Sequence, residues 1–111
     1  MEITSKEFKH CHLVNVNGRV DSSTAPQFSQ ALDALNEKGI YKLVIDMSGL
    51  EYMSSAGFRA LLSAQRNSKR YHRGEVLLAA VPERIREALE LAGFTELFRT
   101  FAEPLEAVGS F

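Results

Sequence analysis

Two adjacent serines, Ser54 and Ser55, are the side chains of this sequence best placed for chemistry, because they separate an apolar run from an expected helix. The start of a helix presents unpaired backbone N–H groups and about half a positive charge, so it readily binds an anion or a phosphate group. In this arrangement Ser54 caps the helix and Ser55 lies in its first turn, with its hydroxyl near the surface. Gly57 leaves the first turn without a side chain, so that another molecule can come close. The pattern therefore indicates either a serine that is phosphorylated or a pair of serines that only cap a helix.

Other kinds of chemical site find less support. The serines are not a hydrolase nucleophile, because that motif needs Gly two residues before the serine and Met53 stands two before Ser55. An aspartyl phosphoacceptor at Asp46 would need a pair of carboxylates near residues 14–17 to hold Mg²⁺, and Val14-Asn15-Val16-Asn17 contains none. His10 and His12 share one face of an expected strand, and two ligands do not make a structural zinc site. We therefore expect no enzymatic activity, no cofactor and no metal, and we expect Asp46 to support the loop before the second helix.

The spacing of apolar residues predicts the elements that position the serines. An opening hairpin is expected, with a first strand near 3–8 and a second that starts near residue 8 and reaches a turn at Asn17-Gly18, followed by a short extended piece. Ser23 or Thr24 is the expected side-chain cap of the first helix, and Thr24 with Gln27 has the spacing of a capping box. The remaining expectations are helices over 24–38, 54–73, 82–92 and 103–108, a loop over 48–53, and strands over 41–47, 76–81 and 97–101. Gly39, Gly74 and Gly93 are the expected helix stops.

Alternating strands and helices after an opening hairpin predict an α/β fold whose strands are mostly parallel and joined by right-handed crossovers. In open α/β sheets, functional residues usually lie where a strand ends and a helix begins. Two such places attract attention, residues 21–24 and residues 48–57.

Length and charge narrow the class of protein further. The chain has 111 residues, with 13 Lys and Arg against 14 Asp and Glu, which suits one domain over residues 1–111 and does not favour direct binding of nucleic acid. The apolar runs are too short to cross a membrane, the first residues do not resemble a signal peptide, and Cys11 has no disulfide partner, so a cytoplasmic protein is expected. The formal charge is uneven: residues 1–55 carry −2, residues 56–82 carry +4 and residues 83–111 carry −3. The basic run from Arg66 to Arg73 suits either the negative end of a helix or an acidic partner.

Several landmarks together resemble a known family. The segment Met53-Ser54-Ser55-Ala56-Gly57-Phe58, after a strand ending in Asp46, and Gly18-Arg19-Val20-Asp21, before the first helix, are similar to those of STAS domains in anti-sigma factor antagonists. The resemblance covers nearly the whole chain, including Thr24-Ala25-Pro26 and the closing Gly93-Phe94 with Leu97-Phe98. It implies a small mixed, mostly parallel sheet with helices mainly on one face.

The resemblance also implies a switch. In that family the unphosphorylated antagonist binds an anti-sigma factor that is also a serine kinase, which frees a sigma factor. Phosphorylation breaks the complex, and a serine/threonine phosphatase restores it. By position the acceptor is Ser55, with Ser54 the second choice because the family's frequent acidic residue is a serine here.

The implied partner-binding residues are Asp21, Ser22, Ser23, Ser54, Ser55, Gly57 and Phe58, supported by Asp46. A phosphate on Ser55, expected close to Asp21 and Asp46, would turn a neutral contact face into an anionic one. The same fold also serves as an unphosphorylated STAS scaffold or as a cytoplasmic subunit of a membrane transport complex, and the sequence leaves that alternative open.

Overall fold

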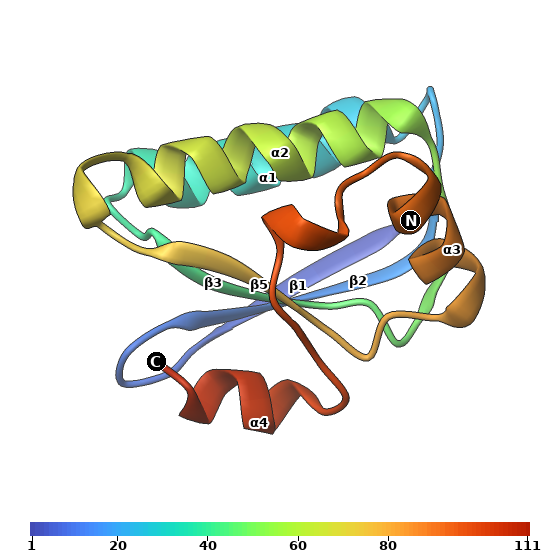
Figure 1. The fold of residues 1–111 in the computed structure, drawn as a ribbon. Coiled ribbons are helices and arrows are strands. Elements are labelled where there is room, and N and C mark those ends of the chain that lie inside the picture. Colours follow the sequence, from blue (N-terminus) through green and yellow to red (C-terminus); the bar gives the residue numbers. More distant parts are fainter.

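The computed structural model describes all of residues 1–111 and confirms a mixed, mostly parallel sheet flanked by helices (Figure 1). The strands are β1 (Glu2–Glu7), β2 (His12–Val20), β3 (Lys42–Asp46), β4 (Leu50–Met53), β5 (Glu75–Ala79) and β6 (Thr100–Phe101). The helices are α1 (Ala25–Glu37), α2 (Ser55–Lys69), α3 (Glu83–Leu91) and α4 (Pro104–Gly109), with short 3₁₀ turns at Arg70–His72 and Thr95–Leu97. The sheet has the order β1-β2-β3-β5-β6, and only β1 with β2 is antiparallel; β4 pairs with the end of β2.

The helices cover the two faces of the sheet unequally, as Figure 1 shows. Helices α1 and α2 lie together across one face, whereas α4 lies on the other. Alternate residues of β3 divide accordingly: Leu43 and Ile45 join the larger core with Phe28 and Leu61, and Val44 joins a smaller core under α4. Burial on both faces explains why the central strands consist almost entirely of apolar residues.

The opening hairpin is confirmed, but the turn predicted after its second strand, at Asn17-Gly18, is wrong. The chain reverses between Phe8 and Cys11, where the Phe8 N–H donates to the Cys11 carbonyl at 2.8 Å. Asn17-Gly18 is not a turn, because β2 continues through it to Val20 with a shift of register after Gly18. Gly18 has a φ of +95°, which marks a bulge, and its N–H donates to Gly49 at 2.9 Å.

The predicted loop over residues 48–53 contains a strand, β4, that pairs in parallel with the end of β2. Leu50 and Met53 are buried, while Glu51 and Tyr52 are exposed. The strand was missed because its pairing partner is distant in sequence and its four residues show no regular alternation. It places the start of α2 directly beside the end of β2.

The predicted stop of α2 at Gly74 is wrong, since the helix ends at Lys69 and a 3₁₀ turn follows. Gly74 is required for another reason: a Cβ there would collide with the Tyr41 carbonyl. The stop of α3 at Gly93 is confirmed, because Gly93 has a φ of +75° and Phe94 N–H donates to Leu89 across the last turn at 2.9 Å.

The last strand is shorter than predicted, because a side chain occupies part of its position. Gln65 of α2 donates to the carbonyls of Val76 at 3.1 Å and Leu97 at 2.8 Å, and it accepts from Val76 N–H at 2.7 Å. The carboxamide thus pairs with β5 as a neighbouring strand would, and β6 begins only beyond it, at Thr100. The predicted closing helix over 103–108 is confirmed as α4.

Candidate functional site

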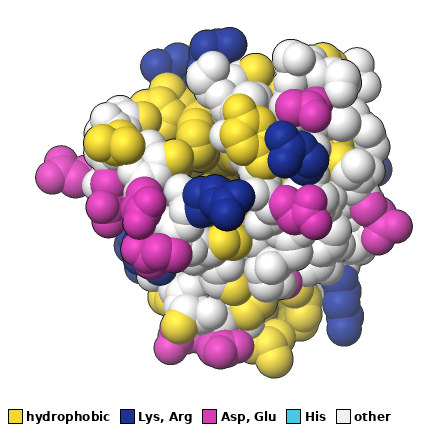
Figure 2. Space-filling model, turned by 90° about the vertical axis from the view of Figure 1, so that its right-hand side faces the viewer, with side chains coloured by type: hydrophobic (Ala, Val, Ile, Leu, Met, Phe, Trp, Pro, Cys, Tyr) yellow, Lys and Arg dark blue, Asp and Glu magenta, His cyan; other side chains and the backbone are white.

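The two places predicted to carry function lie side by side at the carboxyl ends of the parallel strands. Val20 of β2 is opposite Met53 of β4, and the Ser54 N–H donates to the Val20 carbonyl at 2.7 Å. The segment that follows Val20 therefore adjoins the start of α2. Figure 2 shows this end of the molecule, where hydrophobic side chains gather beside Lys or Arg and several carboxylates.

The two serines have different surroundings. Ser54 is the N-cap of α2, with an extended backbone, and its Oγ accepts from the Gly57 N–H at 3.4 Å. This confirms the predicted cap. Ser55 is the first residue of the helix and is exposed, and its hydroxyl makes no hydrogen bond within the protein. Of the two, Ser55 offers the free and accessible hydroxyl.

Gly57 and Phe58 support the site from below, which corrects the expectation that Gly57 makes room for another molecule. A Cβ on Gly57 would lie 2.6 Å from Met53 Cγ and 2.9 Å from Val20 Cγ1, so the missing side chain makes room for the protein's own core. Phe58 is 7 % exposed and meets the ring of Phe94 edge to face, with the ring centres 6.1 Å apart. Both residues fix the position of the helix start.

Asp21 organises the loop before α1. Its Oδ1 accepts from the Ser23 N–H at 3.0 Å, from the Ser23 hydroxyl at 2.7 Å and from the Thr24 N–H at 3.2 Å. The hydrogen bond from the Ser23 hydroxyl is the main cause that lowers the pKa of Asp21, followed by that from the Ser23 N–H. Ser22 and Ser23 are exposed. The loop thus presents an ionised carboxylate and two hydroxyl-bearing residues beside α2.

The prediction that the Thr24 side chain caps α1 is wrong, because it makes no capping hydrogen bond. Its hydroxyl donates to the Arg19 carbonyl at 2.8 Å and accepts from the Asp21 N–H at 2.9 Å. The hydroxyl is therefore committed to closing the loop, and Pro26 near the helix start removes one backbone donor that would need a cap.

Asp46 has the predicted supporting role, because its Oδ1 accepts from Ser48 N–H at 3.0 Å in the loop before β4. The expectation that it lies close to Ser55 is wrong. Asp46 is opposite Asn15 on β2, five residues before Val20. At about 3.3 Å per residue, that is a separation of about 16 Å along the strand.

Two exposed arginines near the serines were not singled out from the sequence. Arg59 follows Ser55 by four residues, one helical turn, and forms no ion pair. It also lines an open groove of about 370 Å³ between α1 and α2, together with Ser22 and Ala56. Arg19 lies over the ring of Tyr52 at 4.6 Å. The four-residue spacing of Ser55 and Arg59 was visible in the sequence and marks them as neighbours on one helix face.

The His10-Cys11-His12 segment lies at the far end of the sheet. Cys11 is 4 % exposed, and burial raises the pKa of its thiol, an effect partly opposed by the charge of Lys42. No group of three or more His, Cys, Asp or Glu side chains is arranged to hold a metal ion. No helix combines the length and the apolar character needed to cross a membrane.

Known proteins are similar to this chain over nearly its whole length. The STAS domain family model matches residues 2–107. A Bordetella bronchiseptica protein, BtrV, classed as an anti-sigma factor antagonist, is 31 % identical over 98 residues, which cover 88 % of this chain and 84 % of that protein. A crystal structure of an anti-sigma factor antagonist from Mycobacterium paratuberculosis superposes with a TM-score of 0.87 at 24 % identity, covering 98 % of this chain and 92 % of that one. A sulfate transporter family protein of Wolinella succinogenes shares the fold, with a TM-score of 0.71, 24 % identity and coverage of 88 % and 81 % of the two chains.

Proposed function

The chain belongs to the STAS domain family of anti-sigma factor antagonists, and we propose that it is a binding protein switched by phosphorylation of Ser55. In its unphosphorylated form it binds an anti-sigma factor that is also a serine kinase, and so frees a sigma factor. Phosphorylation ends this binding, and a serine/threonine phosphatase restores it. The exchange takes place in the cytoplasm and needs neither catalysis by this chain nor direct contact with nucleic acid.

The proposal rests on the difference in exposure and hydrogen bonding between the two serines. Ser54 is half-buried and accepts a hydrogen bond as the helix cap, whereas the Ser55 hydroxyl is exposed and unbonded. A kinase can reach Ser55 without unfolding the start of α2. For this reason we assign the acceptor to Ser55 and a structural role to Ser54.

A phosphate at Ser55 would change the charge of the contact face without requiring a new fold. It adds about −1.5 to −2 charges, whereas the whole chain carries a formal net charge of −1. The helix start and Arg59 are positioned to stabilise it within the protein. A partner that packs against Ser55 and the Asp21 loop would meet a bulky anion beside an ionised carboxylate, and binding is lost by clash and repulsion.

The contact face that we propose comprises the exposed residues Ser22, Ser23 and Ser55, with Asp21 and Ser54 at its centre. Gly57 and Phe58 act beneath it by holding the start of α2. The transporter relative shares only the fold, so an unphosphorylated scaffold or transport subunit is the alternative that phosphosite analysis separates from this proposal.

The experiment is phosphosite mapping of the protein isolated from its native cells, combined with phosphorylation by the cognate kinase in vitro. We expect one phosphate on Ser55, its complete loss in Ser55→Ala and its retention in Ser54→Ala. Binding to the unphosphorylated partner, measured by calorimetry, should weaken at least tenfold in Ser55→Asp and persist in Ser55→Ala. Equal affinities of these two variants, or a protein never phosphorylated in its cells, would contradict the proposal and favour the scaffold or transport role.

A further inference from the structure

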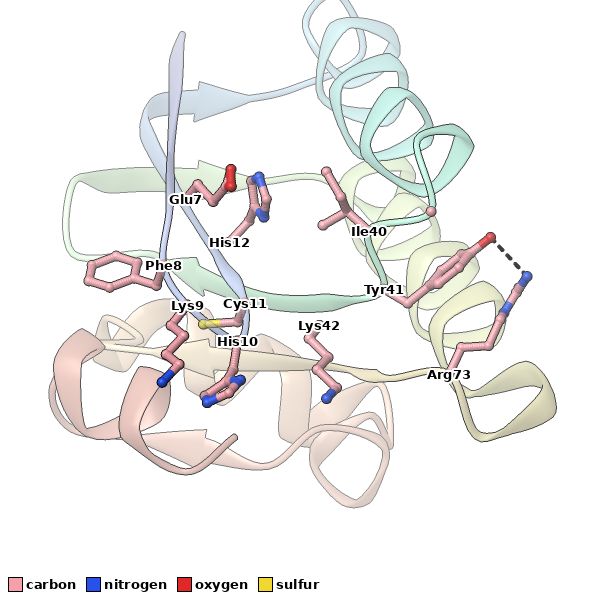
Figure 3. Close-up of a pocket in the computed structure, with 11 residues that line it drawn as sticks. Glu7, Phe8, Lys9, His10, Cys11, His12, Ile40, Tyr41, Lys42 and Arg73 are labelled. Atoms are coloured by element: carbon pink, nitrogen blue, oxygen red, sulfur yellow. Dashed lines mark hydrogen bonds between the residues drawn. The ribbon is translucent and has the colours of Figure 1, made fainter.

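Two adjoining hollows lie at the end of the molecule opposite Ser55. The first, of about 360 Å³, is lined by residues 7–12 of the hairpin turn, by residues 39–42 and by Arg73 (Figure 3). The second, of about 540 Å³, is lined by Lys42, Lys69, residues 72–75, Arg99 and Phe111. They adjoin, because Lys42 and Arg73 line both, and we call the two together the basic cleft.

The basic cleft concentrates positive charge that the protein does not neutralise. Its lining contains five Lys and Arg side chains but only two acidic side chains, those of Glu7 and Glu75. Glu75 is already paired with Arg99 at 3.0 Å. The three lysines Lys9, Lys42 and Lys69 are exposed and form no ion pair. In a chain with a formal net charge of −1, this end is a local source of positive potential.

The cleft contains both a hydrogen-bonded cation and unpaired ones. The Arg73 guanidinium donates to the Asn67 carbonyl at 2.6 Å, the Tyr41 hydroxyl at 2.8 Å and the Arg70 carbonyl at 3.1 Å. Figure 3 shows the bond to Tyr41, over whose ring Arg73 also lies at 3.7 Å. Arg73 is thus part of the wall, whereas the lysines have free ammonium groups. A single phosphate is bound by several fixed donors that converge on it, whereas unpaired lysines spread along a depression suit an acidic chain.

The first hollow also has apolar parts in its lining. Phe8, Ile40 and Tyr41 are partly exposed there, with Phe8 on one side of the hollow and Ile40 and Tyr41 on the other (Figure 3). An acidic segment with an apolar residue between its carboxylates would fill this hollow and contact the lysines on either side. Asp33 and Glu37 line a neighbouring depression, which shares Tyr41 and Arg73 with the first hollow. These carboxylates limit the occupant to a short segment. They would repel the phosphates of a nucleic acid strand or of a flat anionic membrane surface.

The turn that brings the second hollow together is strained. Tyr71 and His72 both have positive φ values, 58° and 56°, although neither is glycine. Such residues are uncommon, and strained backbone concentrates at binding sites. The positive φ angles of Tyr71 and His72 turn the chain sharply after α2, so that His72 and Arg73 line the cleft.

We propose that the basic cleft binds a short acidic segment of a partner protein, anchored by one apolar side chain. The 15 residues of α2 separate the cleft from Ser55, a distance of about 22 Å at 1.5 Å per residue. Binding in the cleft therefore leaves Ser55 free and is independent of the proposed phosphoswitch.

The test uses a fluorescent peptide of sequence Glu-Glu-Asp-Phe-Glu-Asp-Glu and a second in which Ser replaces Phe. Anisotropy gives the Kd, and amide chemical shifts locate the site. We expect the Phe peptide to shift the amides of residues 8–12 and 40–42 and to bind more tightly than the Ser peptide. Lys42→Glu and Lys69→Glu should each weaken binding by about threefold to tenfold, with a steep loss as salt increases.

The matched control is Arg84→Glu, which makes the same charge change at an exposed position of α3 outside the cleft. It should change the Kd less than twofold, and Ser55→Asp should leave the peptide affinity unchanged. An equal effect of Arg84→Glu, an absence of shifts at the cleft, or tighter binding of a deoxythymidine oligonucleotide or of phosphatidylserine vesicles than of the Phe peptide would overturn the proposal.

Discussion

Gly57→Ala should destabilise the protein even though alanine is the better helix former. The new Cβ would lie 2.6 Å from Met53 Cγ and 2.9 Å from Val20 Cγ1, both closer than atoms pack. Met53 is flexible and can move aside, but Val20 is fully buried and its branched side chain has few alternatives. The helix start must therefore shift away from β2.

The size of the effect follows from two opposed terms. Overpacking of a tight core costs about 1–3 kcal/mol. Replacing Gly by Ala in a helix returns up to about 1 kcal/mol, and less in the first turn, where few residues precede it. We expect a net loss of about 1–2 kcal/mol in the free energy of unfolding, or about 4–8 °C in Tm for a chain of this size.

Gly109→Ala is the matched control, because Gly109 is likewise a glycine within a helix but has no atom within 4 Å of the position of the new Cβ. It should change the free energy of unfolding by less than about 0.5 kcal/mol. Urea unfolding followed by circular dichroism measures both variants. Chemical shifts should also report a movement of the Asp21 loop in Gly57→Ala, since the Ser54 N–H bonds to β2 beside that loop. A Gly57→Ala protein as stable as the control would refute the packing argument.

Three further predictions test individual contacts. Ser54→Ala should lower the free energy of unfolding by about 0.5 kcal/mol, the low end for a cap because its hydrogen bond is 3.4 Å long, whereas Ser55→Ala should leave it unchanged in the same urea titration. Gln65→Met should cost about 2–4 kcal/mol, because it strips hydrogen bonds from buried backbone groups at the edge of β5, and exposed Arg66→Met should cost almost nothing; equal Tm values would contradict this. The carboxyl of Asp21 should titrate by NMR below its ordinary pKa of about 3.9, so that its stabilising contribution is complete above that pH and is lost only as the pH falls through the lower value in the folded protein.

Features with a strong local period were predictable from the sequence. The stripe that begins at Phe28 predicted α1, and the apolar run ending at Asp46 predicted a central strand, because each pattern records burial by its own element. The serine pair was predictable for the same reason, since a cap depends on residues within one turn of the helix.

Features that depend on distant partners were not predictable. β4 exists because the end of β2 pairs with it, and Asp46 lies far from Ser55 because the register of β2 with β3 and β4 separates them. The same limit applies to Gln65, whose carboxamide replaces part of an edge strand that the local sequence 97–101 suggested. Gly57 was predicted to make room for another molecule, but the space beside it is filled by the protein's own Met53 and Val20. The sequence shows only that a side chain is absent there and not which atoms occupy the space.

The arrangement of charge along α2 explains why a modification at Ser55 should act on binding rather than on the fold. The positive end of the helix dipole lies at Ser55, the first turn contains no acidic residue, and Arg59 is one turn away without an ion pair. A phosphate at this position is therefore attracted by the chain that carries it. The repulsion it creates is directed outward, toward whatever packs against the ionised Asp21 loop. In the proposed switch, a helix start that tolerates the anion and a contact face that does not would make binding reversible while the sheet and both cores remain unchanged.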